Sequence, residues 1–83
     1  MLVGGDVMDE LLTKEQFSNI VGKTIYKLRS ELGLSQEQFA GNAGLGRTHY
    51  GSVERGEKAI SAFNLYILLE SNGISVSGFF EKI

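Results

Sequence analysis

The sequence contains no cysteine, no proline and no tryptophan, and it has a single histidine among its 83 residues. Without cysteine the chain can form neither a disulfide framework nor a thiolate metal site. The one histidine, His49, has no second ligand beside it and so does not indicate a metal site. No carboxylate pair of notable spacing and no phosphate-cradling loop followed by lysine is present. Because so small a core leaves little room for a catalytic pocket, we expect no enzymatic activity, no cofactor and no bound metal.

Long hydrophobic runs are missing as well. No apolar stretch approaches the ~20 residues that span a bilayer. The opening segment, MLVGGDVMDELL, lacks the basic region and the long apolar stretch of a signal peptide. A chain of this length buries only about 60–65% of its unfolded surface, which is typical of one small domain. We therefore expect a single-domain cytoplasmic protein that makes no contact with a membrane.

The sequence also lacks an excess of positive charge, since its formal net charge is −2. Taken alone this disfavours nucleic-acid binding, which usually needs a basic surface. The acids are concentrated at the start, however. Residues 1–16 carry four acidic residues and one lysine, a charge of −3, which leaves +1 for residues 17–83. We expect residues 1–12 to form an acidic, poorly ordered tail and residues 13–83 to form the folded domain, where any DNA-binding surface must come from local clustering of cations.

What the sequence does contain is a series of helix signals. The segment TKEQF, residues 13–17, has the form of a capping box. It opens a stripe of residues at three- and four-residue steps that predicts a helix of about 19 residues, ending at Gly33. The stripe consists of Phe17, Ile20, Val21, Thr24, Ile25, Leu28 and Leu32. Further helices are expected after Ser35, Gly46, Ser61 and Ser75.

No segment shows the sustained two-residue alternation of a strand, so the predicted fold is all-α with five helices. Phe39, Ala40 and Ala43 form the expected inward side of the second helix. In the fourth helix the inward positions are predicted to be Phe63, Tyr66, Ile67 and Leu69.

The second and third predicted helices are joined by a short turn containing glycine, which is the helix-turn-helix pattern. The segments LSQEQFA, AGLGRTHYGSVERG and SNGISVSGFF carry a closer resemblance. From about residue 17 to residue 80 the chain resembles the phage Cro and repressor family, the Xre-like group, and within it the short controller proteins of restriction–modification systems. The resemblance implies a five-helix bundle of the lambda-repressor-like type and a bacterial or phage-encoded, nucleoid-associated regulator of transcription.

A helical wheel of residues 46–55 agrees with this interpretation without reference to the family. Tyr50 and Val53 point to one side and would anchor the helix to the core. The other side carries small or hydrogen-bonding residues, which a major groove about 12 Å wide can admit. We expect this helix to read bases at its N-terminal part. The predicted base-reading residues are Arg47, Thr48, His49 and Ser52.

Several of these residues have an alternative interpretation. Arg47 is the main candidate for a bidentate contact to guanine, but it could instead pair with a phosphate. Gly51 either lets the helix approach the duplex closely or is a tolerated weak point. Arg55 and Lys58, at the end of the same helix and in the loop beyond, are predicted to contact phosphates.

The resemblance implies roles for three further residues. In that family a glutamine at the position of Gln36 clamps the DNA backbone, and here it lies in the first turn of a helix, where free N–H groups favour an anion. Residues matching Arg29 and Glu54 often form a partly buried salt bridge that ties the first helix to the recognition helix. We expect this structural pair here.

Apolar residues near the end of the chain suggest self-association, since a domain this small cannot bury them all. The candidates for the dimer interface are Tyr66, Phe79, Phe80 and Ile83, some of which must instead complete the core. The expected function is a homodimeric, sequence-specific transcriptional regulator that binds a double-stranded, pseudo-palindromic operator. The alternative is a protein-interaction module on the same fold, such as an antitoxin with a toxin as its partner.

Overall fold

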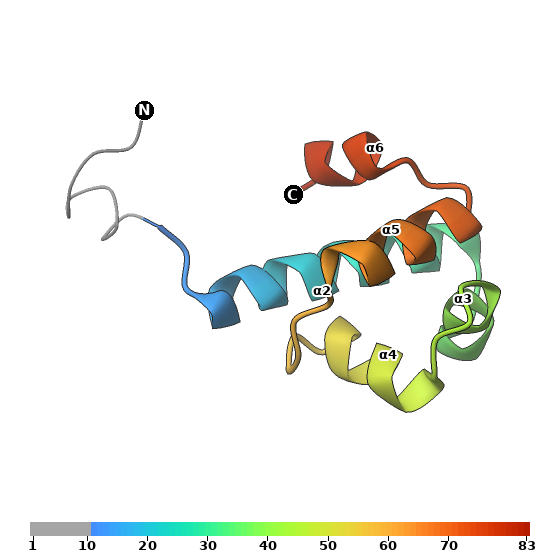
Figure 1. Ribbon diagram of the computed structural model, residues 1–83. Helices are drawn as coiled ribbons and strands as arrows, with labels where there is room; N and C mark the ends of the chain where they lie inside the picture. Colours follow the sequence, from blue (N-terminus) through green and yellow to red (C-terminus); the bar gives the residue numbers. More distant parts are fainter. Residues whose placement is uncertain (1–10) are drawn as a thin grey trace.

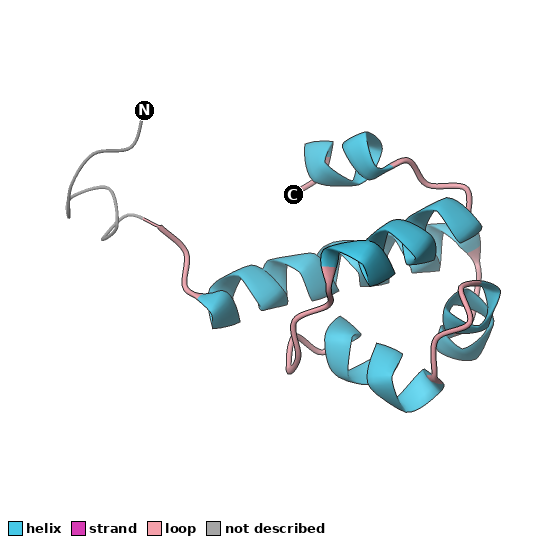
Figure 2. Cartoon of the chain, in the orientation of Figure 1, coloured by secondary structure: helices cyan, strands magenta, loops and turns pink. Residues whose placement is uncertain are grey.

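The computed structural model describes residues 11–83, so nearly all of the predicted tail, residues 1–12, lies outside the described residues. Within the described range the chain forms helices and loops and contains no strand (Figure 1 and Figure 2). The helices are α2 (Lys14–Leu32), α3 (Gln36–Asn42), α4 (Arg47–Glu54), α5 (Ala62–Ser71) and α6 (Val76–Glu81). The predicted all-α fold is confirmed, with the expected order of helices.

The first helix begins at the capping box that the sequence indicates. The Thr13 hydroxyl accepts from the backbone N–H of Gln16 at 3.1 Å, and the Gln16 side chain accepts from the Thr13 N–H at 2.8 Å. The helix ends at Gly33, whose φ of 72° is a left-handed conformation that glycine adopts at little cost. Both ends of α2 are therefore set by local interactions.

Serine side chains cap the N-termini of three of the other helices. The hydroxyls of Ser35, Ser61 and Ser75 each accept from the backbone N–H three residues later, at 3.0 Å. α4 differs because it is preceded by Gly46, which supplies no side-chain cap. Among the helices that the structure describes, only α4 has first-turn N–H groups without a side-chain acceptor from its cap residue.

α4 packs against both α2 and α3, and α5 packs against α3 and α6. In Figure 1 α4 lies below α2, and α6 lies above α5 at the opposite side of the molecule. Every helix contributes to one core. The buried apolar residues are Val21, Ile25, Leu28, Phe39, Ala40, Tyr50, Val53, Leu65, Leu68, Leu69 and Phe79.

The inward side of α5 differs from the prediction. Leu65 and Leu68 are buried together with Leu69, whereas Phe63 and Tyr66 are 68% and 52% exposed. The prediction that Phe63 and Tyr66 point inward is therefore wrong. Seven of the ten positions of this helix are apolar, so the spacing alone cannot select a face. Leucine is also easier to bury than tyrosine because it carries no hydroxyl that needs a partner.

The apolar stripe of α2 also extends beyond the core at both ends. Phe17 and Leu32 are 43% and 46% exposed, although the middle of the stripe is buried. A helix of 19 residues is about 28 Å long. The other described helices have 6 to 10 residues and cannot cover its whole length.

No helix within residues 11–83 combines the length and the apolar character needed to cross a membrane. In the same part of the chain, no group of three or more histidine, aspartate or glutamate side chains is arranged to hold a metal ion.

Candidate nucleic-acid interface

α4 is held close to α2 at a glycine that the sequence analysis did not single out. A Cβ atom on Gly22 would lie 2.5 Å from the carbonyl oxygen of Glu54 and 2.7 Å from that of Val53. Backbone atoms cannot move aside as the end of a flexible side chain can, so only glycine allows this approach. The available signal was a glycine inside a long helix, which costs about 1 kcal/mol of helix propensity and therefore calls for a structural reason.

The carboxylate of Glu54 connects α4 with the two helices beside it. Arg29 of α2 donates to both of its oxygens, from Nε at 2.8 Å and from Nη2 at 3.0 Å. Gln36 of α3 donates to Oε1 at 2.8 Å, and the Tyr50 hydroxyl donates to Oε2. Arg29 also donates to the Leu34 carbonyl at 2.7 Å. The expected Arg29–Glu54 pair thus forms a bidentate salt bridge whose side chains are only 13% and 6% exposed, and it orients α4 on the rest of the domain.

The ionisation of this cluster follows from its contacts. Burial acts to raise the pKa of the Glu54 carboxyl, but the hydrogen bonds from Arg29, Tyr50 and Gln36 outweigh it, so the pKa lies below its ordinary value. The hydrogen bond to Glu54 raises the pKa of Arg29. Burial, together with the hydrogen bond to Glu54, raises the pKa of Tyr50. At neutral pH the cluster therefore contains one anion, one cation and a neutral phenol.

The inner side of α4 is anchored where the periodicity predicts. Tyr50 and Val53 are buried, with exposed fractions of 0% and 1%. The Tyr50 ring packs on Phe39 of α3, with 5.7 Å between the ring centroids. The anchored side chains come from the middle and the end of an eight-residue helix, so its opposite side is held facing outward.

The outer side of α4 carries the residues predicted to read bases. Arg47 and Thr48 are exposed, and Ser52 and His49 are partly buried. The Ser52 hydroxyl donates to the Thr48 carbonyl at 3.2 Å, so its oxygen lone pairs remain available to an outside donor. The exposure of Arg47 and Thr48 leaves their polar groups accessible to a ligand.

A shallow hollow of about 190 Å³ lies between the start of α3 and the outer side of α4. Its lining residues are Gln36, Arg47, Thr48, Gly51 and Arg55. It therefore brings predicted base-reading and phosphate-binding residues together. A Cβ on Gly51 would come within 3.1 Å of the Arg55 guanidinium, the movable end of a side chain. Gly51 thus gives the Arg55 side chain room to lie along α4.

The residues predicted to bind phosphate differ in the hydrogen bonds and ion pairs that their side chains already make within the protein. The Gln36 amide uses one of its two N–H groups on Glu54 and keeps the other. Arg55 forms an exposed bidentate pair with Glu57, at 2.8 and 3.1 Å, which the sequence analysis did not foresee. The guanidinium of Arg55 holds the pKa of the Glu57 carboxyl below its usual value. Because exposed ion pairs contribute little stability, Arg55 can exchange Glu57 for a phosphate at small cost. Lys58 is exposed in the loop beyond.

Of the four residues predicted to form a dimer interface, one is buried and three are exposed. Phe79 is fully buried in the core, so its assignment to an interface is wrong. Phe80, Ile83 and Tyr66 are 47%, 43% and 52% exposed. Phe63, which was expected inside, stacks on Tyr66 with 6.4 Å between ring centroids. The exposed large apolar residues in the last part of the chain, here called the aromatic patch, are Phe63, Tyr66, Phe80 and Ile83.

Comparison with known proteins agrees with this geometry. A family model described as helix-turn-helix matches residues 25–79. The control protein C.MunI of a Mycoplasma species is 41% identical over 63 residues, which cover 75% of this chain and 85% of that protein. The control protein C.SmaI of Serratia marcescens is 40% identical over 57 residues, or 69% of this chain and 68% of that protein. The HTH-type transcriptional regulator y4dJ of Sinorhizobium fredii is 34% identical over 56 residues, or 68% and 73%.

These matches confirm the resemblance to the Xre-like group and its controller proteins that the sequence motifs indicate. The matched residues include the hollow beside α4 and the whole Glu54 cluster. Proteins of this kind are DNA-binding regulators and not enzymes, as the residue content led us to expect. The chain belongs to the helix-turn-helix family of DNA-binding transcriptional regulators.

Proposed function

We propose that the protein acts as a homodimer that reads a pseudo-palindromic DNA operator, with α4 of each subunit in a major groove. The observation that supports this proposal is the difference between the buried inner side and the polar outer side of α4. Its inner residues Tyr50 and Val53 are buried, and Glu54 is bonded to both neighbouring helices. Its outer residues are small or polar and are therefore compatible with base edges.

Arg47 is the principal base-reading residue in this proposal. It is exposed at the N-terminal end of α4, the end at which recognition helices contact bases. Arginine contacts guanine O6 and N7 in a bidentate manner. Thr48, Ser52 and His49 contribute further contacts to bases or to the edge of the groove. The uncapped first turn of α4 after Gly46 leaves N–H groups for an acceptor on the DNA.

Gln36, Arg55 and Lys58 hold the backbone on either side of the reading helix. The free amide N–H of Gln36 is a phosphate donor at the start of α3. Arg55 exchanges Glu57 for phosphate, and Lys58 supplies a flexible cation next to it. Such contacts fix the register of α4 without reading sequence.

Dimerisation supplies the specificity that one short helix lacks. Two half-sites about 34 Å apart on one side of the duplex let two copies of α4 bind together, which multiplies the discrimination of each. The aromatic patch on α5 and α6 is the proposed self-association surface, with Phe63 added and Phe79 removed relative to the sequence-based set. A symmetric contact through one patch is the usual form of a two-fold dimer.

Selection of bound duplexes from a random pool tests the function directly, and we expect an inverted repeat to be recovered. Arg47→Ala should relax the preference at one base pair of each half-site, at a cost of about 1–3 kcal/mol for the preferred sequence. Lys27→Ala, at an exposed position of α2, is the control. An equal loss of affinity for all sequences would make Arg47 a phosphate contact.

The same aromatic patch favours one alternative, a protein-interaction module such as an antitoxin. The stacked pair Phe63 and Tyr66 could equally face a different protein. The two functions differ in their DNA behaviour. A DNA-binding dimer loses affinity steeply as salt rises, whereas a module of the second kind shows neither sequence preference nor a salt slope.

A further inference from the structure

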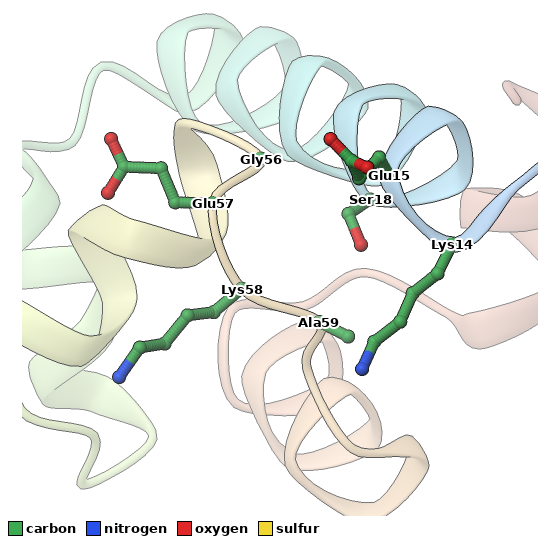
Figure 3. Close-up of a pocket in the computed structure, with 7 residues that line it drawn as sticks. All are labelled: Lys14, Glu15, Ser18, Gly56, Glu57, Lys58 and Ala59. Carbon is green, nitrogen blue, oxygen red and sulfur yellow. The ribbon is translucent and has the colours of Figure 1, made fainter.

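A second and larger cavity, of about 340 Å³, lies between the first turns of α2 and the loop that follows α4 (Figure 3). It is lined by Lys14, Glu15 and Ser18 of α2 and by residues 56–59 of the loop. It shares no lining residue with the hollow beside α3 and α4. This cavity is therefore a separate feature of the surface.

Ser18 is the residue of this cavity whose burial needs an explanation. It is 7% exposed although it carries a polar hydroxyl. Figure 3 shows its hydroxyl directed into the space between α2 and the loop. None of the side-chain hydrogen bonds within residues 11–83 involves this hydroxyl. No buried side-chain oxygen or nitrogen among residues 11–83 lacks a hydrogen-bond partner, so the Ser18 oxygen reaches solvent and is free to bond a group that enters the cavity.

The charged residues around the cavity favour an anion. The Lys14 side chain runs along its edge toward Ala59, and Lys58 extends from the loop. Both lysines are exposed, so their ammonium groups can turn toward a ligand. The carboxylates of Glu15 and Glu57 are turned away from the space in front of Ser18, and Glu57 is paired with Arg55. A ligand in front of Ser18 would therefore meet the hydroxyl and the Lys14 ammonium, whereas the exposed Lys58 side chain points away from this space and would have to rotate toward it.

We propose that this cavity binds a phosphate group of the DNA backbone, with Ser18 and Lys14 as donors beside Lys58. The inference rests on the proposed DNA-binding function. The loop of residues 56–59 directly continues α4, whose eight residues span about 12 Å. In the proposed complex Arg47 enters the groove at the start of α4, so the cavity beyond the end of α4 would lie toward the DNA backbone.

Salt-dependent binding of a mixed-sequence duplex of about 30 base pairs tests the assignment through two variants. Lys14→Gln should lower the slope of log K against log salt by about one, because one phosphate contact carries a slope of about −0.9. Ser18→Ala should weaken binding roughly tenfold with the slope unchanged, because the lost donor is neutral. The matched controls Lys23→Gln and Ser30→Ala change exposed residues of the same helix and should bind as the wild type does.

Ser18→Ala removes only a hydroxyl and places a better helix former in α2, so thermal unfolding should show a folded protein. If Lys14→Gln and Ser18→Ala bind like their controls while the wild type keeps its salt slope, the phosphate site is refuted and the proposed function stands. If the wild type shows no salt slope, the proposed function itself fails. Inorganic phosphate that shifts the Ser18 and Ala59 amide resonances, with duplex binding unchanged in both variants, would overturn the DNA assignment in favour of a free anion.

Discussion

Replacing Arg29 by methionine should destabilise the domain by about 2–3 kcal/mol. The substitution removes two hydrogen bonds to the Glu54 carboxylate and one to the Leu34 carbonyl, while methionine keeps most of the apolar stem of arginine. Removing one partner of a fully buried ion pair costs about 3–5 kcal/mol, because the remaining charge stays uncompensated. Here the cost is smaller, since Glu54 retains its bonds from Gln36 and Tyr50.

The expected loss of stability is a large share of the domain's total free energy of unfolding. The free energy of unfolding of a domain of this size is about 4–12 kcal/mol. Arg29→Met should therefore lower the melting temperature by roughly 10–20 °C. Urea denaturation followed by circular dichroism measures the free energy of unfolding, and the m-value should stay constant because the same surface is exposed. Lys27→Met, at an exposed position two residues earlier in α2, is the matched control.

A double-mutant cycle separates the pair from its surroundings. Arg29→Met, Glu54→Gln and the double variant should give a coupling energy of about 1–2 kcal/mol. Coupling near zero, together with a loss no larger than that of Lys27→Met, would refute the reasoning, because the two charges would then behave as independent surface groups.

Two further predictions concern the same helix contact. Because the folded-state pKa of Glu54 is lowered, its stabilisation is complete above the unfolded pKa of about 4.3 and is lost as pH falls below that value through the folded pKa. In urea titrations at about pH 6 and about pH 3, Glu54→Gln should therefore lose less stability than the wild type; equal losses would contradict the assignment. Gly22→Ala should destabilise by about 2 kcal/mol or more, since its Cβ meets two carbonyl oxygens of α4. Gly41→Ala, with no atom within 4 Å, should stabilise by roughly 0.4–1 kcal/mol, and the reverse order in melting temperature would rule out the close approach.

The features that the sequence predicts well are those that short segments determine. The capping box at Thr13 and the serine caps at Ser35, Ser61 and Ser75 each depend on atoms within three residues. The burial of Tyr50 was also predictable, because the outer side of α4 offers no competing apolar face.

The features that were missed depend on contacts between distant segments. α5 is apolar around most of its circumference, so the choice between Phe63 and Leu65 is made by α3 and α6, against which it packs. Phe79 and Phe80 are neighbours, and only one can face the core. The need for Gly22 exists only because the carbonyl groups at the end of α4 lie against it. The local sequence around each of these residues contains no pattern strong enough to predict its burial or its close contact.

The buried and the exposed residues of α4 have separate roles, and this separation affects how such a regulator can change its DNA target. The residues that hold the helix in place, Tyr50, Val53 and Glu54, are buried, whereas Arg47 and Thr48 project into solvent and bond nothing that supports the fold. Exposed substitutions of that kind usually alter stability by less than about 0.5 kcal/mol. If Arg47 and Thr48 read bases as proposed, exchanging those two side chains would redirect the protein to a new operator while its scaffold remains intact, so related regulators would diverge in target before they diverge in architecture.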